Sequence, residues 1–248
     1  MHRLFCHSGD ISVSKISIDD KEQVHHARDV LRLKENENVA ISDGKGNEYL
    51  CSLEGVSSKG MVFNILSKRN VPPPAVKISV GCAIPKGPRM DDIIDKLTQL
   101  GVSRIIPLET ERVVVKLSRE KKYMKQKRWE KIAFSASLQS QRNVLPVVDT
   151  VKKLGELLTE AAGFDLKLIP TLSGNRIGLK CALEKIKPKS VLVLIGPEGD
   201  FTPGEVRASQ KAGFIPVSLG ELVLRVDTAA SAAAAFIRFY YDPQYGNS

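Results

Sequence analysis

From residue 76 onward, apolar runs alternate with segments of helical character, and this rhythm constrains the fold more than any other feature. The apolar runs are Val76–Ala83, Ile105–Leu108, Leu166–Pro170, Val191–Ile195 and Ile215–Leu219. The helical segments are Asp91–Leu100, Arg119–Leu138, Leu154–Ala162, Pro203–Ala212 and Thr228–Tyr241. Unbroken apolar strands separated by helices form parallel sheets that are covered on both faces. We therefore predict an α/β domain whose ligands bind beyond the carboxyl ends of its strands.

The first 70 residues have a different pattern, with short strands and turns. The predicted strands are Val39–Ser42, Glu48–Leu53 and Met61–Leu66. The stretch Asp43–Gly46 is a strong turn signal. One helix is predicted between Asp19 and Arg32, with Asp19 or Asp20 as its N-cap. This pattern indicates a small β-barrel.

Three consecutive prolines, Pro72 to Pro74, separate the two patterns. They stiffen the chain and cannot continue a sheet interior, so we place one domain at 1–71 and a second at 75–248. No signal peptide opens the sequence and no apolar run is long enough to span a membrane, so we expect a cytoplasmic protein. The four cysteines form no C-x-x-C pair, and no metal site is expected.

The formal net charge of +9 is concentrated in one stretch. Between Arg112 and Arg142 there are ten basic and two acidic residues, which gives +8 within 31 residues. Concentrated positive charge favours binding to nucleic-acid phosphates, because each contact releases condensed counterions. The alternative is a solvated helix whose lysine stems lie along apolar surface. Trp129 in this stretch is predicted to be a core anchor rather than a platform for base stacking.

The loop between residues 195 and 203 is the first segment that could carry chemistry. A buried strand ends at Gly196, and Thr202 with Glu205 matches a helix capping box around Pro203. A loop with two glycines and a proline exposes backbone groups that can bind the edge of a purine. It matches neither the Walker A nor the Rossmann glycine pattern. An ordinary turn from strand to helix is the alternative.

The second such segment covers residues 218–230. A strand ends near Gly220, an irregular stretch carries Arg225, and an alanine-rich helix follows. Asp227 or Thr228 is predicted to cap this helix. The small side chains after Thr228 allow a close approach of the backbone to a ligand, or simply tight helix packing.

Together, these two segments resemble one family of RNA-modifying enzymes. The motif I-G-P-E-G at 195–199 and the motif L-G-x-x-x-L-R-x-[DE]-T-A at 219–229 occur in the order found in bacterial small-subunit rRNA methyltransferases that make N3-methyluridine, the RsmE-like branch of the SPOUT superfamily. Further similar segments are 26–32, 84–91, 96–102, 111–116, 128–132 and 139–146. The resemblance therefore covers nearly the whole chain.

The resemblance implies a fold, a cofactor and partners. The fold would be a SPOUT-type parallel sheet with a C-terminal trefoil knot, preceded by a PUA-like β-barrel that helps to bind RNA. Knots are rare among folds, and the residue pattern alone does not predict one. The cofactor would be S-adenosyl-L-methionine, the substrate 16S rRNA or the small ribosomal subunit, and the assembly a homodimer.

The resemblance also implies site residues, carried over position by position. The cofactor-binding residues would be Thr171, Leu172, Ile195, Gly196, Pro197, Glu198, Gly199, Leu219, Gly220, Leu224, Arg225, Thr228 and Ala229. The RNA-binding residues would be Arg28, Arg32, Lys86, Arg89, Arg112, Lys116 and Arg128. The catalytic residues would be Arg225, Arg142 and Glu198.

The demands of the reaction explain why these residues of the matched motifs are catalytic candidates. Methylation at uridine N3 requires loss of the imide proton, which spreads negative charge onto the flanking carbonyl oxygens, and the guanidinium of Arg225 or Arg142 could stabilise that charge. Glu198 is a candidate proton acceptor, although we expect it more to fix its loop through hydrogen bonds. His25 and His26 are expected to be structural or to face RNA.

Three departures from the family pattern leave alternatives open. Glu221-Leu222 stands where the family has Pro-Arg, Val226-Asp227 where it has Thr-Glu, and 138–142 reads L-Q-S-Q-R instead of E-Q-S-G-R. One alternative is an RNA-binding protein of the same fold that has lost or altered its activity. The other is a methyltransferase of the same superfamily that acts on another RNA.

Overall fold

The computed structural model describes residues 1–57, 60–113, 117–172 and 174–242. The chain divides into two compact units. The first consists of Met1–Pro73 with Ser137–Leu145, and the second of Pro74–Ala136 with Pro146–Ser248. The first unit thus includes a segment that the sequence analysis placed in the second domain, whereas the domain limits at 71 and 75 themselves stay a prediction.

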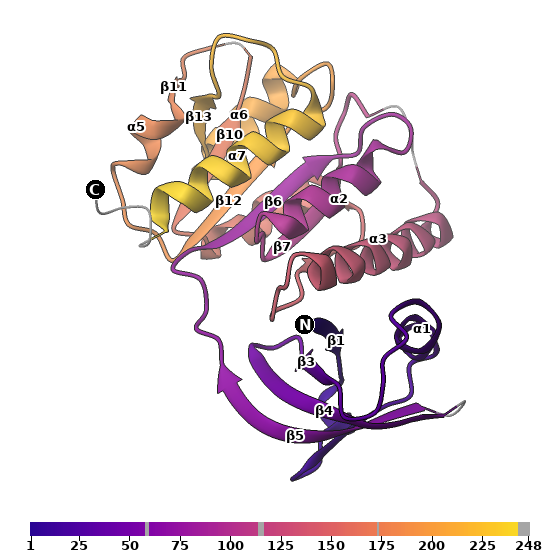
Figure 1. The fold of residues 1–248 in the computed structure, drawn as a ribbon. Coiled ribbons are helices and arrows are strands. Elements are labelled where there is room, and N and C mark those ends of the chain that lie inside the picture. Colours follow the sequence, from indigo (N-terminus) through magenta and orange to yellow (C-terminus); the bar gives the residue numbers. More distant parts are fainter. Residues whose placement is uncertain (58–59, 114–116, 173, 243–248) are drawn as a thin grey trace. The chain divides into compact units, whose positions relative to one another are not determined.

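The first unit is built on one strongly curved sheet (Figure 1). Its strands are β1 (His2–Phe5), β2 (Lys15–Ile18), β3 (Asn38–Ser42), β4 (Asn47–Ser57) and β5 (Gly60–Asn70). The order is β1-β3-β4-β5-β2, with β1 parallel to β3 and the other pairs antiparallel. The three predicted strands are confirmed as β3, β4 and β5. Register shifts in β4 at Leu50/Cys51 and Leu53/Gly55 bend the long hairpin, as bulges do.

The helix predicted in this unit is shorter than expected. It consists of α1 (Lys21–His25) and a π-helical turn, His26–Val30. Asp20 is confirmed as the N-cap, because its Oδ1 accepts a hydrogen bond of 2.8 Å from the backbone N–H of Gln23.

Residues 137–145 complete the first unit by pairing with the turn between β3 and β4. The hydroxyl of Ser42 donates to the Asn143 carbonyl at 2.9 Å, and the N–H of Leu145 donates to the Gly44 carbonyl at 3.1 Å. Arg3 Nη1 also donates to the side-chain oxygen of Asn143. The glycine-rich turn therefore holds a strand-like partner from a distant part of the sequence.

The second unit contains a parallel sheet, as predicted. Its strands are β6 (Lys77–Ala83), β7 (Arg104–Glu109), β8 (Val147–Val148), β9 (Lys152–Lys153), β10 (Leu166–Pro170), β11 (Ile177–Gly178), β12 (Ser190–Ile195) and β13 (Ile215–Ser218). The order is β11-β13-β10-β12-β6-β7-β8, and β9 also pairs with β7. The five predicted strands are confirmed as β6, β7, β10, β12 and β13, whereas the two-residue strands β8, β9 and β11 were not predicted.

Helices cover both faces of this sheet. One face packs against α2 (Arg89–Gln99), α3 (Arg119–Gln139), α5 (Leu179–Leu183) and α7 (Val226–Tyr241), and α2 and α7 lie side by side over it (Figure 1). The other face packs against α4 (Leu154–Glu160) and α6 (Pro203–Lys211). Strand β12 shows the alternation directly, since Val193 contributes to the first core and Leu192 to the second.

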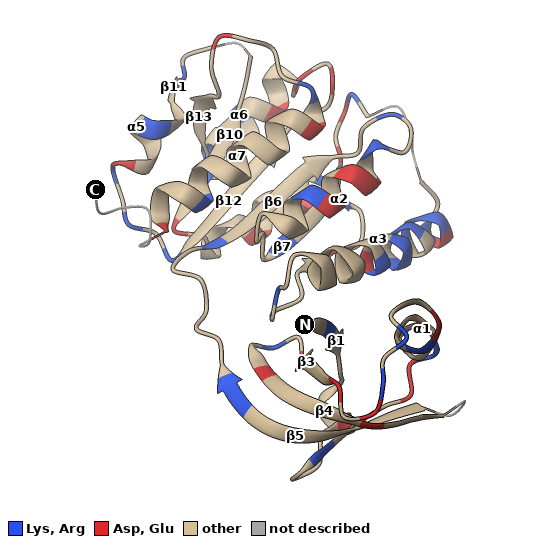
Figure 2. Ribbon diagram, viewed as in Figure 1, with Lys and Arg blue, Asp and Glu red and all other residues tan. Residues whose placement is uncertain are grey.

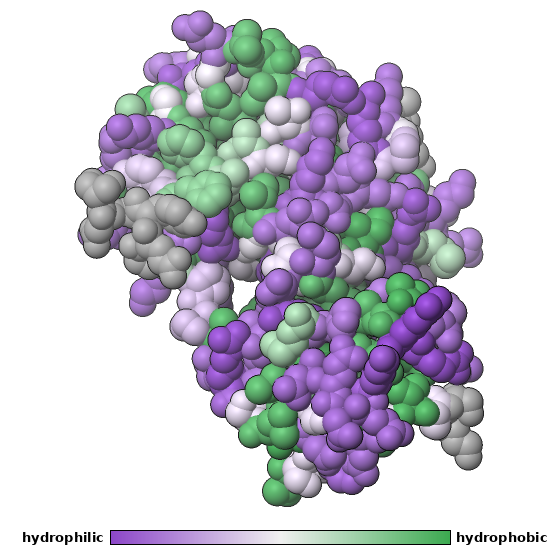
Figure 3. Space-filling model, in the orientation of Figure 1, coloured by the Kyte–Doolittle hydropathy of each residue, from purple (hydrophilic) through white to green (hydrophobic). Residues whose placement is uncertain are grey.

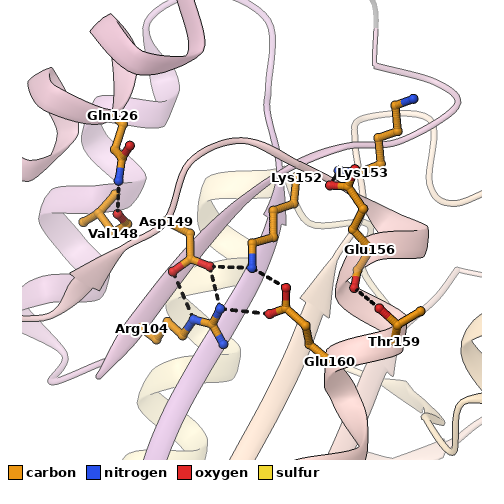
Figure 4. Close-up of polar contacts among 9 residues, drawn as sticks. All are labelled: Arg104, Gln126, Val148, Asp149, Lys152, Lys153, Glu156, Thr159 and Glu160. Carbon is orange, nitrogen blue, oxygen red and sulfur yellow. Dashed lines mark hydrogen bonds and ion pairs between the residues drawn. The ribbon is translucent and has the colours of Figure 1, made fainter. Parts of the chain in front are cut away.

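A network of ion pairs fixes the edge of the sheet next to α4 (Figure 4). Arg104 on β7 makes two hydrogen bonds to Asp149, of 3.0 and 2.6 Å, and one of 3.0 Å to Glu160. Lys152 lies 3.1 Å from Asp149 and 2.5 Å from Glu160. The network joins the short strands β8 and β9 to α4. Each of these strands has only two residues and therefore few backbone hydrogen bonds of its own.

The trefoil knot that the resemblance implies stays a prediction. In the described parts of the chain, no helix is long and apolar enough to cross a membrane. Nor do three or more potential metal ligands gather anywhere among those residues.

Candidate cofactor site and basic surface

A hollow lies at the carboxyl ends of β10, β12 and β13, where the sequence placed the chemistry. It has a volume of about 580 Å³, part of it open to solvent. Ten of the thirteen predicted cofactor residues line it: Thr171, Leu172, Ile195, Gly196, Pro197, Glu198, Leu219, Gly220, Leu224 and Ala229. Gly199, Arg225 and Thr228 do not line it. The other lining residues, which sequence reasoning missed, are Pro170, Arg176, Asp200, Leu222, Val223 and Val226.

The loop after β12 is joined to the start of α6 by hydrogen bonds. The N–H of Glu205 donates to the Thr202 hydroxyl at 3.2 Å, and the N–H of Thr202 donates to the Glu205 carboxylate at 2.9 Å, which confirms the predicted capping box. The second oxygen of the buried Glu205 accepts a bond of 2.9 Å from the N–H of Glu111. The box therefore also attaches the segment after β7 to this loop.

Asp200 joins two walls of the hollow. Its Oδ2 accepts a hydrogen bond of 2.8 Å from the N–H of Leu172, and its Oδ1 accepts one of 2.8 Å from the N–H of Phe201. Its φ is +60°, a left-handed conformation in which aspartate is enriched. An aspartate between a Pro-Glu-Gly turn and a helix cap is the signal that could have identified it from sequence.

Two glycines allow the backbone to form this hollow. A Cβ atom at Gly196 would lie 3.1 Å from the Phe201 ring and 3.3 Å from Asp200 Oδ1. Gly220 has a φ of +129°, which side-chain-bearing residues rarely adopt. Residues 219–225 belong to no helix or strand, so their backbone groups are outside any ladder. Apolar walls with exposed backbone groups between them fit a planar adenine ring.

The start of α7 differs from the prediction, and the expected cap at Asp227 or Thr228 is wrong. The N-cap is Arg225, whose side chain makes no capping hydrogen bond, and the helix begins at the buried Val226. Asp227 lies in the first turn, where a carboxylate is stabilised by the helix dipole. It also lies 3.7 Å from Arg225 Nε and 3.9 Å from Lys96 Nζ.

Glu198 lines the hollow and is tied to the loop after β6. Its Oε1 accepts hydrogen bonds from the backbone N–H of Lys86, at 3.3 Å, and from Arg89 Nη1, at 3.2 Å. Behind it, Cys82 is fully buried, and burial together with the charges of Asp227 and Glu198 raises the pKa of this thiol to about 12. The contacts of Glu198 agree with a loop-fixing role.

Arg142 lies in the 137–145 segment, outside the residues that line the hollow. Its Nε donates a hydrogen bond of 3.1 Å to the carbonyl of Val144. The preceding residue, Gln141, has a φ of +57°, so the segment turns sharply before Arg142.

Most of the predicted RNA-binding side chains have partners within the protein. Arg28 makes two bonds to Asp29, and these bonds hold the pKa of the Asp29 carboxyl at about 2. Arg128 makes bonds of 3.0 and 2.5 Å to Asp91. Arg112 contacts the carbonyl oxygens of Gly199 and Asp200. Arg32 is exposed with a φ of +52°, and Lys116 lies outside the described residues.

Helix α3 carries the basic stretch (Figure 2), and Lys and Arg are concentrated along its first half. Trp129 is 1% exposed, lies in the core of the second unit, and donates from Nε1 to Asp91 at 3.1 Å. The prediction that Trp129 is a core anchor is confirmed.

Comparison with known proteins agrees with this arrangement. Residues 72–238 match the model of the RNA methyltransferase domain, and residues 18–66 match that of the RNA methyltransferase PUA domain. The ribosomal RNA small subunit methyltransferase E of Bacillus subtilis is 32% identical over 227 residues, which is 88% of each chain. The chain belongs to this family of RNA methyltransferases. The suspected membership in the RsmE family is thereby confirmed, and with it the α/β methyltransferase domain and the PUA domain.

Two solved structures of methyltransferases have the same fold. A methyltransferase from Legionella pneumophila in complex with the cofactor SAM is 32% identical, with a TM-score of 0.84 over 95% of this chain and 96% of that one. The methyltransferase E of Neisseria gonorrhoeae, bound to S-adenosyl methionine, is 29% identical, with a TM-score of 0.84 over 96% and 97% of the two chains.

Proposed function

We propose that this RsmE-family chain transfers a methyl group from S-adenosylmethionine to N3 of a uridine in 16S rRNA. The observation that carries the proposal is the hollow at the carboxyl ends of three parallel strands, lined by ten of the thirteen residues that the resemblance assigns to cofactor binding. S-adenosylmethionine bound in two solved relatives supports the proposal, as does the ribosomal RNA named for the Neisseria gonorrhoeae and Bacillus subtilis proteins. A cytoplasmic location in bacteria accords with this function.

The hollow would hold the cofactor by its apolar walls and its backbone. Leu172, Leu219 and Leu224 would enclose the adenine ring, and the loops at Gly196 and Gly220 would offer backbone groups to its edge. When bound, S-adenosylmethionine supplies a methyl group on a positively charged sulfur. The protein's task is then to align uridine N3 with that group and to stabilise the charge left by the imide proton.

Of the two arginines that are candidates for this second task, Arg225 is the better placed. It caps α7 next to the lining residues Leu224 and Val226, and its side chain is 65% exposed. Arg225→Ala should lower turnover far more than affinity for S-adenosylmethionine, which single-turnover kinetics and calorimetry would measure. Unchanged turnover would exclude Arg225 and leave Arg142 as the candidate.

Binding of S-adenosylmethionine, measured by calorimetry, tests the site itself. Leu172 is 47% exposed, so Leu172→Arg should fold while placing a positive charge beside a cationic ligand. We expect this variant to lose at least about tenfold in affinity, equivalent to about 1.4 kcal/mol. Ile186→Arg, at a 38% exposed site away from the hollow, is the matched control. Absence of binding to the wild type would favour an RNA-binding protein without methyl transfer.

We also propose that the chain forms a homodimer. Leu222 and Val223 are 81% and 73% exposed, and Phe236 and Phe239 of α7 are 43% and 53% exposed. Apolar side chains are visible over the part of the second unit where α7 runs (Figure 3). Exposed apolar groups of this kind mark interaction surfaces. Sedimentation velocity would show a dimer, and a monomer at micromolar concentration would contradict it.

A further inference from the structure

Arg112 lies in the connection between β7 and α3, and its side chain reaches the loop after β12. Its Nη1 donates to the carbonyl oxygen of Gly199 and lies 3.4 Å from the carbonyl oxygen of Asp200. These two carbonyls belong to the peptide groups on either side of the Asp200 Cα. One guanidinium nitrogen therefore holds both of the peptide planes that define φ and ψ of Asp200.

Asp200 needs such support because of its backbone conformation. A residue with a side chain at a φ of +60° is strained by roughly 1 kcal/mol or more, and it stays there only when its surroundings hold it. In this conformation the Asp200 carboxylate accepts hydrogen bonds from the backbone N–H groups of Leu172 and Phe201. The geometry of the Leu172 wall therefore depends on the backbone of Asp200.

The connection that carries Arg112 is itself anchored. The N–H of Glu111 donates to the buried Glu205 carboxylate at 2.9 Å, which fixes the backbone next to Arg112. A Cβ atom at Gly199 would lie 3.5 Å from Arg112 Cδ, so the arginine stem packs directly over this glycine. Both the aliphatic stem and the guanidinium of Arg112 therefore contact the loop after β12.

We propose that Arg112 is a positioning residue for the cofactor hollow, although the sequence placed it among the RNA contacts. Arg112 fixes the backbone of Asp200, and the Asp200 carboxylate in turn fixes the wall at Leu172. The inference rests on the proposed function, since it describes how the same hollow keeps its shape before any ligand enters.

Amide hydrogen exchange in the cofactor-free protein tests the inference without relying on cofactor binding. In Arg112→Gln, the Leu172 N–H should exchange at least about tenfold faster, because its acceptor is no longer held. Arg207→Gln, which removes an exposed arginine of α6, is the control and should leave this rate unchanged. Arg112→Lys retains a cationic donor and should restore part of the protection. An unchanged Leu172 rate in Arg112→Gln would overturn the inference even if the wild type binds cofactor.

Calorimetry in the absence of RNA gives a second, independent readout. Arg112→Gln should weaken S-adenosylmethionine binding by about tenfold, whereas the thermal midpoint should match that of Arg207→Gln. An arginine that only contacts phosphates would behave differently. Its loss would lower RNA affinity and reduce the salt dependence by about one unit, while leaving cofactor affinity without RNA unchanged. That second pattern would overturn the positioning role.

Discussion

At the residue scale, Gly81 in β6 is closely surrounded by core side chains. A Cβ atom there would lie 2.7 Å from Leu157 Cδ2, 2.9 Å from Leu194 Cδ2 and 3.2 Å from Leu108 Cδ1. All three leucines are fully buried in the core beneath α4 and α6. A methyl group can therefore be accommodated only if several core side chains shift together.

We accordingly expect Gly81→Ala to lower the free energy of unfolding by about 1–3 kcal/mol, the usual range for overpacking a core. Gly155→Ala is the matched control, because no atom lies within 4 Å of a Cβ atom at that position in α4. It should leave stability unchanged or raise it by up to about 1 kcal/mol, since alanine favours helix over glycine. Urea unfolding measures both variants, and equal effects would contradict the packing argument.

Single residues were predictable where a motif defines their surroundings. The capping pair Thr202 and Glu205 and most of the lining residues follow from local sequence. The place of Arg176 in the hollow was not predictable. Its side chain donates a hydrogen bond of 2.5 Å to the Thr171 carbonyl, and the sequence does not define the turn that brings the two together. The contacts of Arg112 were missed for the same reason, since they join segments 87 residues apart.

At the scale of elements, ion pairs between side chains reinforce the two-residue strands β8 and β9. Glu160 accepts from Lys152 and Arg104, and these hydrogen bonds lower the pKa of its carboxyl below the ordinary value of 4.5. A carboxyl with a lowered pKa in the folded state stabilises that state at neutral pH. The stabilisation is complete above the ordinary pKa and is lost as the pH falls through the lower pKa of the folded state.

Glu160→Gln should therefore destabilise the protein at pH 7 and have less effect near pH 3. The side chain is 39% exposed, so we expect no more than about 1 kcal/mol at pH 7. Asp149→Asn should have a larger effect, about 2 kcal/mol, because that carboxylate is only 9% exposed and accepts two hydrogen bonds from Arg104 in addition to its pairing with Lys152. Urea unfolding at the two pH values measures the difference, and a pH-independent effect of Glu160→Gln would contradict this account.

The elements that the sequence predicted are those long enough to show a repeating pattern of apolar residues. The apolar strands from Val76 to Leu219 and their helices have this length. Strands of two residues, such as Ile177–Gly178, have no periodicity and are defined only by their neighbour β13. The start of α7 was misplaced because capping residues at Asp227 and Thr228 suggested a later start, whereas burial of Val226 extends the helix backward.

At the scale of the whole molecule, the positive charge of α3 should govern RNA affinity. Lys122 pairs with Glu109 at 2.8 Å and Arg128 pairs with Asp91. Lys121 and Lys131 lie on the same helix and are exposed to solvent. We expect RNA affinity to fall steeply as the salt concentration rises. The double variant Lys121→Gln, Lys131→Gln should reduce the slope of log affinity against log salt concentration by about two units at most. Filter binding at several salt concentrations measures this slope, and a flat response would remove α3 from the RNA surface.

The place of residues 137–145 in the first unit has a consequence for synthesis. The turn at Asp43–Gly46 is made early, but the segment that pairs with it follows Pro73 by more than sixty residues. At about 5–20 residues per second, the ribosome takes roughly 4 to 14 s to go from residue 73 to residue 145. During that interval the N-terminal sheet is complete in its own strands yet lacks Asn143 and Leu145. The N-terminal domain therefore emerges before the catalytic domain but cannot be finished until about two fifths of the catalytic domain has followed it.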